Sequence, residues 1–145
     1  MIGSTVERPP RPGDLVALER EDCVDRLGAA DFVRVAFTAD DAPTVMPVNH
    51  LLHDGAIYFR TAPGSKLGTA AAGGLVAIEA DDGDVRRRIG WSVVAHGRAS
   101  IVTDDEVIET LHATPFEPWA LPDDRSFWIR VDVHDISGRE IIRPS

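Results

Sequence analysis

The sequence predicts a mainly β protein, a small antiparallel barrel with short helices at its ends or sides. About six segments alternate apolar and polar residues with the period of two that half-buried strands show. Tight-turn signals separate several of these segments, and the strongest is Asp54-Gly55. Consecutive strands joined by such turns pair antiparallel, and a run of hairpins closes readily into a barrel.

The composition is that of a folded domain rather than of a disordered chain. Of the 145 residues, 43% are hydrophobic and 27% are charged, which is enough apolar material for one core. We expect a flexible N-terminal arm over residues 1–13 and a single β-barrel domain over residues 14–145. The formal net charge of -9 argues against nucleic acid as the main partner, because phosphate neutralisation needs a basic surface.

No segment of the sequence indicates a membrane or a secreted protein. No apolar run approaches the roughly 18 residues of a transmembrane helix, and residues 1–12 lack the apolar centre of a secretory signal. The single cysteine, Cys23, excludes an internal disulfide framework and is expected to be a small packing residue. We therefore expect a cytoplasmic protein.

The first half of the domain predicts one helix and three strands. Apolar residues spaced among charged ones indicate an amphipathic helix around 19–28. From Asp31 onward the period changes to two, and Asp40-Asp41 and Asp54-Gly55 supply turns. The predicted strands are 32–37, 43–52 and 56–61.

The second half predicts two short helices, three further strands and a tail strand. We expect Asp81–Asp84 to form an acidic turn that leads into a solvated loop of three arginines, and Gly97 to mark a bend or bulge. The predicted helices are 67–72 and 104–113, followed by a proline-rich loop at 115–124. The predicted strands are 75–80, 89–102, 127–135 and the tail 139–142.

Pro47 is an unusual residue for the middle of a strand. Proline cannot donate a ladder hydrogen bond, so its strand is expected at a sheet edge, at a bulge, or beside something other than a strand. A bound ligand would be such a neighbour.

The segment 57–67 predicts a strand, a turn at Pro63-Gly64 and the start of a helix. A helix start attracts anions because its first N–H groups are unpaired. Donor side chains crowd this corner, so it fits a phosphate site: Arg60, Thr61, Ser65 and Lys66. Taken alone, these residues favour the simpler interpretation, an ordinary corner in which Ser65 caps the helix and the two cations are solvated.

Motifs of well-known reactions are missing from the sequence. It contains no nucleophile elbow, no Rossmann or Walker glycine motif, and its five histidines lack the spacing of a metal site. The tryptophans Trp91, Trp119 and Trp128 fit core or interface packing, or alternatively a wall for a planar aromatic cofactor.

Three segments, in their order and spacing, carry a family resemblance that covers roughly residues 31–138. They are Val45-Met46-Pro47-Val48, then Asp54-Gly55-x-x-Tyr58-Phe59-Arg60-Thr61-Ala62-Pro63-Gly64-Ser65-Lys66-Leu67, then Gly90-Trp91-Ser92-Val93-Val94-x-x-Gly97-Arg98-Ala99. Together they resemble the pyridoxamine 5'-phosphate oxidase-like family. The most similar branch is the short bacterial one that includes the nitroimidazole-resistance (Nim-like) proteins.

This resemblance implies a split β-barrel homodimer that binds FMN at the interface between its subunits. It implies that one group of residues holds the phosphate and ribityl chain: Arg60, Thr61, Ser65 and Lys66, with Leu67 next to them. It implies that a strand backbone faces the isoalloxazine edge: Val45, Met46, Pro47 and Val48. It further implies that Trp91 and Ser92 reach the flavin of the partner subunit, and that Trp128, near Arg130, lies by a C-terminal pair that contacts the cofactor.

Two departures from the oxidases narrow the expected function. Val45 occupies a position where the oxidases carry a basic residue, so phosphate binding is expected to depend on Arg60 and Lys66. The sequence also lacks the Arg-x-His tail of the true oxidases, so pyridoxamine phosphate is not the expected substrate.

We therefore expect an FMN-dependent oxidoreductase that acts on an unknown small molecule, with no metal site and no side chain assigned to catalysis. One alternative is the same fold with a deazaflavin or a haem, for which His50 and His53 are the only histidines near the expected site. Another alternative is a dimeric cofactor-binding module that catalyses no reaction.

Overall fold

The computed structural model describes residues 8–116, 118–119 and 125–142. The described strands are β1 (Leu15–Ala17), β2 (Val33–Ala39), β3 (Ala42–Val48), β4 (Leu51–His53), β5 (Ala56–Thr61), β6 (Leu75–Asp84), β7 (Ile89–Ile101) and β8 (Phe127–Ile141). The described helices are α1 (Arg20–Ala29), α2 (Lys66–Ala71) and α3 (Asp105–Ala113).

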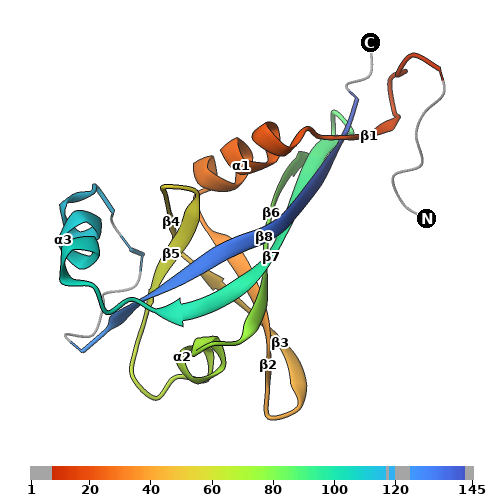
Figure 1. Ribbon diagram of the computed structural model, residues 1–145. Coiled ribbons are helices and arrows are strands. Elements are labelled where there is room, and N and C mark those ends of the chain that lie inside the picture. The colour runs from red at the N-terminus through yellow and green to blue at the C-terminus, as the bar shows by residue number, and fades with distance from the viewer. Residues whose placement is uncertain (1–7, 117, 120–124, 143–145) are drawn as a thin grey trace.

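The strands form one antiparallel sheet that curls into a split barrel, as predicted (Figure 1). Their order is β3-β2-β6-β7-β8-β5-β4, and β1 pairs with the far end of β8. The barrel is split because β3 and β4, which stand at the two ends of this order, do not pair with each other. β3 is therefore an edge strand.

The barrel core consists of the inward-facing side chains of the strands, closed at both ends by helices. α1 covers one end with Cys23 and Leu27, and α2 covers the other with Leu67 and Ala71 (Figure 1). The strands contribute mainly β-branched and aromatic residues, which favour a pleated, buried surface: Val33, Val35, Phe37, Ile57, Phe59, Ile78, Val93, Ile129 and Val131.

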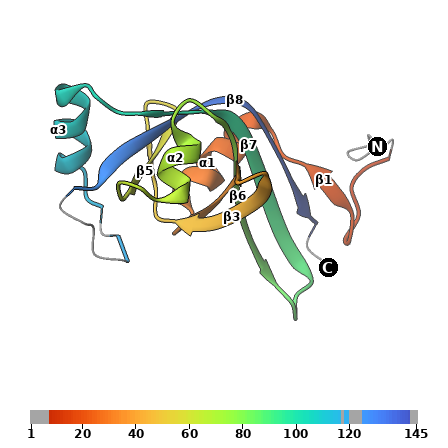
Figure 2. The ribbon, with the colours of Figure 1, turned by 90° about the horizontal axis from the view of Figure 1, so that it is seen from below.

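A second apolar cluster lies outside the barrel, between α3 and strands β5 and β8. Its buried members are Ala56, Tyr58, Leu111 and Trp128. Figure 2 shows α3 standing apart from α1 and α2, beyond the side of the barrel. The outward face of β5 is therefore covered, in contrast to the outward face of β3.

Several predicted elements are confirmed. β5 has the predicted bounds, and Asp54-Gly55 joins it to β4 with φ angles of 48° and 77°. The helix predicted at 67–72 is α2, displaced by one residue, and the helix predicted at 104–113 is α3 with Asp104 as its cap. The register of β7 against β8 shifts between His96 and Gly97, which is the predicted bulge.

The predicted strand 43–52 is wrong, because it is two strands, β3 and β4, with a break at Asn49 and His50. The His50 ring is buried there and its Nε2 lies 2.7 Å from the Leu27 carbonyl oxygen at the end of α1. This contact requires the chain to turn toward α1 and leave the edge of the sheet.

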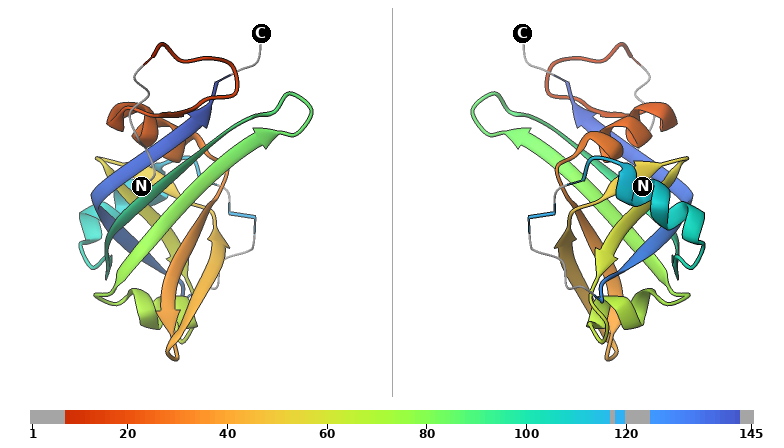
Figure 3. Two further views of the ribbon diagram at one scale, coloured as in Figure 1. Left: turned by 90° about the vertical axis from the view of Figure 1, so that its right-hand side faces the viewer. Right: turned by 90° about the vertical axis from the view of Figure 1, so that its left-hand side faces the viewer.

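The predicted acidic turn at Asp81–Asp84 is wrong, because these residues belong to β6 and pair with β7 up to Asp84 and Ile89. The turn lies at 85–88 instead. The end of this hairpin extends beyond the barrel (Figure 3), and residues 81–88 are all exposed. Strand residues without a buried face carry no apolar alternation, so their sequence resembles a loop.

The predicted strands 127–135 and 139–142 are one continuous strand, β8, and the short strand β1 was not predicted. A Cβ atom on Gly138 would lie 2.9 Å from the Cys23 Sγ atom. Gly138 therefore allows α1 to approach the sheet closely and is not a break.

Part of the predicted N-terminal arm and of the predicted loop 115–124 lies outside the described residues. Within the described part, Arg8 forms an ion pair with Asp14 at 2.9 Å, and the Gly13 N–H donates to the Ile142 carbonyl oxygen at 3.0 Å. Residues 8–14 therefore contact one another and the end of β8.

Candidate functional site

The corner between β5 and α2 is organised by two hydroxyl groups. The Thr61 Oγ1 and Ser65 Oγ atoms lie 2.7 Å apart, and the Ser65 Oγ also accepts the Gly68 N–H at 2.9 Å. Ser65 is thus the helix cap, as the simpler interpretation requires. Only one of the two hydroxyl hydrogens is used within the pair, so the other remains available to a ligand.

Lys66 supplies a cation at the same corner. Its Nζ lies 3.7 Å from the Asp40 Oδ2 atom in the turn between β2 and β3, and the two side chains are 71% and 83% exposed. An ion pair this long and this exposed contributes little to stability, so the ammonium group is free to pair with an anion. The next residue, Leu67, is buried in the core and anchors α2 there.

Arg60 lies on the opposite face of β5 from Thr61, because successive side chains of a strand alternate. Its guanidinium carbon lies 5.6 Å from the ring centroid of Trp128, its cross-strand partner on β8. The Arg60 Nε and Trp128 Nε1 atoms are buried and have no hydrogen-bond partner. The structure therefore brings Arg60 together with Trp128 and separates it from the Thr61–Ser65 pair.

These two unpaired donors are relevant to ligand binding. Buried N–H groups in folded proteins almost always have an acceptor. Two neighbouring buried N–H groups without one therefore indicate a place where an acceptor binds. An anionic or carbonyl-bearing ligand would supply it. The donors of the Thr61–Ser65–Lys66 corner have the same chemistry, so both places fit parts of a phosphorylated cofactor.

β3 contains the residues that were predicted to face the cofactor, and its position confirms the prediction that Pro47 lies at a sheet edge. Among the described strands β3 pairs only with β2, where Pro47 lies opposite Arg34. Val45 is 60% exposed and Met46 38% exposed. The free edge of β3 thus combines unpaired backbone groups with uncovered apolar side chains, which a ligand or a second subunit would cover.

A hollow of about 450 Å³ lies at the Pro47–Val48 end of this strand. Its lining is mainly apolar: Phe32, Arg34, Pro47, Val48, Asn49 and Trp119. The Phe32 and Trp119 rings lie 5.4 Å apart at 60°, and Asn49 Oδ1 accepts the backbone N–H of Trp119 at 2.9 Å. An apolar wall with a few polar groups suits a planar aromatic ligand.

The sequence analysis did not single out Phe32, Arg34 or Asn49 for this hollow. A usable signal existed in the alternation of 32–37, which places Phe32 and Arg34 on the face away from the core. An aromatic ring on an outward face indicates a surface that something covers.

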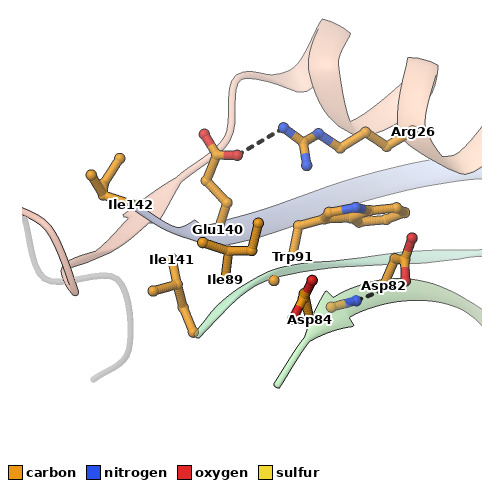
Figure 4. A pocket seen from close by; sticks show the side chains of 10 residues that line it. Arg26, Asp82, Asp84, Ile89, Trp91, Glu140, Ile141 and Ile142 are labelled. Carbon is orange, nitrogen blue, oxygen red and sulfur yellow. Dashed lines mark hydrogen bonds and ion pairs between the residues drawn. The ribbon is translucent and has the colours of Figure 1, made fainter. Parts of the chain in front are cut away.

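Trp91 and Ser92 leave β7 on opposite faces and do not line the hollow at Pro47. Trp91 lines a different hollow, of about 600 Å³, between α1 and the β6–β7 hairpin (Figure 4). The Arg26 guanidinium lies 5.3 Å from the Trp91 ring centroid and pairs with Glu140 at 2.8 Å. The contact of Trp91 and Ser92 with a partner's flavin stays a prediction.

The histidines named for a haem have different surroundings. His50 is buried, and burial lowers the pKa of its imidazole below the ordinary value. Its Nε2–H donates to Leu27, and its Nδ1 is buried without a partner. His53 is partly exposed, with Nε2 3.4 Å from Asp54. While its bond to Leu27 holds, His50 cannot present Nε2 to an iron atom.

No group of three or more histidine, cysteine, aspartate or glutamate residues among the described residues is arranged to hold a metal ion. No helix in the described part of the chain has the length and apolar character needed to cross a membrane.

Comparison with known proteins gives consistent similarities. The family model for pyridoxamine 5'-phosphate oxidase matches residues 19–140. The uncharacterized protein Rv0080 of Mycobacterium tuberculosis is 39% identical over 122 residues, which are 81% of this chain and 80% of the relative.

Solved structures show the same similarity. The FAD binding protein from Mycobacterium smegmatis is 33% identical, with a TM-score of 0.75 over 86% of this chain and 98% of that one. The protein DIP1874 from Corynebacterium diphtheriae, of unknown function, is 30% identical, with a TM-score of 0.74 over 88% and 98%. A protein of Bacteroides thetaiotaomicron named for 5-nitroimidazole resistance, at 15% identity and a TM-score of 0.68 over 94% of this chain and 95% of that one, shares the fold. The chain belongs to the pyridoxamine 5'-phosphate oxidase family.

Proposed function

We propose that this protein binds FMN along the free edge of β3 and acts as an FMN-dependent oxidoreductase on a small molecule. The observation that carries the proposal is the arrangement of β3. One end of its hairpin meets Lys66 through Asp40, and the other end opens into the hollow at Pro47 and Val48. A cofactor with an anionic end and a planar aromatic end fits a strand with these two surroundings.

The roles of the residues follow from their chemistry. Lys66 and the free hydroxyl of the Thr61–Ser65 pair would bind the phosphate through charge-assisted hydrogen bonds. Backbone groups at the free edge of β3 would hydrogen-bond the edge of the ring. Arg60 and Trp128 lie together on the other face of β5, and each has a buried N–H group without a partner. These two groups would donate hydrogen bonds to the cofactor.

The reactivity would come from the cofactor. FMN supplies transfer of a hydride or of electrons, and the protein supplies orientation, electrostatics and exclusion of water. The hollow is suited to that task, because Phe32, Pro47 and Val48 form apolar walls around it.

We also propose that the protein works as a homodimer with the cofactor at the subunit interface. The support is that the edge of β3 leaves large apolar side chains uncovered, with Val45 60% exposed. Leu75, at the start of β6 in the same sheet, is 61% exposed. Light scattering coupled to gel filtration tests this proposal by giving the mass of the particle, which is expected to be twice that of the 15.7 kDa chain.

The identity of the cofactor is tested by denaturing the purified protein, separating the released compounds by chromatography and comparing them with FMN and FAD. The relative from M. smegmatis is an FAD binding protein, so FAD is the competing flavin. Released FMN, or stoichiometric uptake of added FMN, supports the proposal. Exclusive binding of FAD or of a deazaflavin, or the Soret band of a haem, would show that the assignment of FMN is wrong.

Turnover is tested separately from binding. The FMN-loaded protein is mixed with NADH or NADPH under anaerobic conditions, and bleaching of the flavin is followed before and after acceptors are added. Reduction followed by reoxidation supports an oxidoreductase. Tightly bound flavin that no donor reduces would instead indicate a module that binds the cofactor without catalysing a reaction.

A further inference from the structure

Arg34 forms one wall of the hollow at the free edge of β3 and is held there by two carboxylates. Its Nη1 atom lies 3.0 Å from Glu79 Oε1 and 2.7 Å from Asp81 Oδ2, both on β6. Arg34 lies opposite Glu79 on one side and opposite Pro47 on the other. Both Nη1 hydrogens are therefore directed toward β6, away from Pro47.

The other N–H groups of Arg34, on Nε and Nη2, have no hydrogen-bond partner within the part of the chain that the structure describes. The guanidinium carbon lies 5.4 Å from the ring centroid of Phe32, which also lines the hollow. The group is thus held by its ion pairs and by its cation–π contact with Phe32, with donors left for a ligand.

We infer that Arg34 contacts the flavin ring in this hollow and raises its reduction potential, and that Glu79 and Asp81 hold Arg34 in place while opposing its charge. This inference depends on the proposed function, because it assigns an occupant to the hollow. In it, Arg34 is a cofactor-contacting residue, and the two carboxylates are positioning residues.

The sign of the effect follows from charge. Two-electron reduction of a flavin near neutral pH adds negative charge to the ring, and a nearby cation stabilises the reduced form more than the oxidised form. The protein tunes a cofactor by such charges near the ring. The Arg34 side chain is 42% exposed, so water screens part of its charge. A ring seated in the hollow would exclude water between itself and the guanidinium, which leaves the interaction stronger than in bulk water.

The two carboxylates that hold Arg34 differ in how strongly they oppose its charge. Burial and the neighbouring Asp81 raise the pKa of the Glu79 carboxyl group. Asp81, which is exposed, has the shorter contact with Arg34. Removing the charge of Asp81 therefore exposes the positive charge of Arg34 more directly than a change at Glu79 would. Its expected effect on the reduction potential is opposite in sign to that of removing Arg34.

The test measures the midpoint potential of bound FMN by dye-coupled reduction in wild type, Arg34→Gln and Asp81→Asn. We expect Arg34→Gln to lower the potential and Asp81→Asn to raise it. Loss of Arg34 is expected to weaken binding of reduced relative to oxidised FMN about tenfold, which is about 30 mV for a two-electron couple. Arg98→Gln is the matched control, because Arg98 is an exposed arginine on β7 that bonds the Gly73 carbonyl oxygen and does not line the hollow.

Several outcomes separate this inference from the proposed function. If the wild-type protein binds no FMN, both are wrong. If all variants retain FMN and the potential of Arg34→Gln equals that of wild type and Arg98→Gln, only the role of Arg34 is wrong. If Arg34→Gln fails to fold or to bind FMN, Asp81→Asn decides: a raised potential supports the inference, and an unchanged one overturns it.

Discussion

Thr61 and Ser65 place their side-chain oxygens 2.7 Å apart across the turn that joins β5 to α2, and Ser65 also caps the helix. One serine thus serves two purposes, a structural one through the Gly68 N–H and a ligand-binding one through the hydroxyl pair. The first affects the free energy of unfolding and the second affects the affinity for FMN, so two different measurements can separate them.

Ser65→Ala is expected to reduce the free energy of unfolding by about 1 kcal/mol, because a capping acceptor is lost, and also to weaken FMN binding. Asp104→Ala is the matched control, since Asp104 caps α3 through the Glu106 N–H at 2.9 Å. It should cost similar stability and leave FMN affinity unchanged. Urea denaturation and FMN titration measure the two effects. Equal FMN affinity in both variants would contradict the role of Ser65 at the phosphate.

Lys66→Ala is expected to weaken FMN binding about tenfold or more, because a charge-assisted contact contributes roughly 1.5–3 kcal/mol. Its stability should stay close to wild type, since the ion pair with Asp40 is long and exposed. Arg87→Ala is the control, because Arg87 forms an equally long ion pair, 3.7 Å, with Asp84 at the tip of the β6–β7 hairpin. Calorimetric titration with FMN checks the affinities; a similar loss in both variants would indicate a general charge effect.

Gly97→Ala is expected to destabilise the fold by about 1–3 kcal/mol, since the bulge in β7 brings backbone against the glycine. A Cβ atom there would overlap the Asp132 carbonyl oxygen and lie 3.0 Å from the Val131 Cγ1 atom. Ser100→Ala, at an exposed position of the same strand, should have little effect. Thermal and urea denaturation measure the difference. Wild-type stability of Gly97→Ala would mean that the bulge relaxes freely.

His50 is expected to make the fold less stable in mild acid. Burial lowers its folded-state pKa below the unfolded value of about 6.5, so the unfolded chain binds more protons as the pH falls below about 6.5. The stability it contributes is complete above that pH and declines below it. Between about pH 7.5 and about pH 5, wild type should therefore lose more unfolding free energy than His50→Gln, whose amide can still donate to Leu27. Equal losses in the two proteins would contradict this assignment.

The parts of the fold that the sequence predicts correctly are those where at least one face of the element is buried. β5 and the Asp54-Gly55 turn follow from residue pattern and turn chemistry, because the inward residues of β5 enter the core and its outward ones are covered by α3. The predictions are wrong where a contact with a distant part of the chain decides the conformation, or where a strand has no buried face. His50 turns toward α1, Gly138 admits Cys23, and residues 81–84 form a strand with both faces exposed.

The candidate site was predictable in part. Ser65, Lys66 and Pro47 carry local signals, a cap position, a charge and a missing N–H, so the sequence indicates them. The pairing of Arg60 with Trp128 was not predictable, because it depends on the register of β5 against β8 across 68 positions of chain. The hollow at Pro47 likewise depends on how β2, β3 and residues 118–119 meet in space.

The most direct test of the account is an equilibrium titration of the purified protein with FMN, followed by the loss of flavin fluorescence, in wild type, Lys66→Ala and Arg87→Ala. The account predicts saturable binding of one FMN per chain by wild type, weaker binding by Lys66→Ala, and wild-type binding by Arg87→Ala. No saturable binding by wild-type protein, shown to be folded by circular dichroism, would contradict the proposal that the free edge of β3 and the Thr61–Ser65–Lys66 corner form an FMN site.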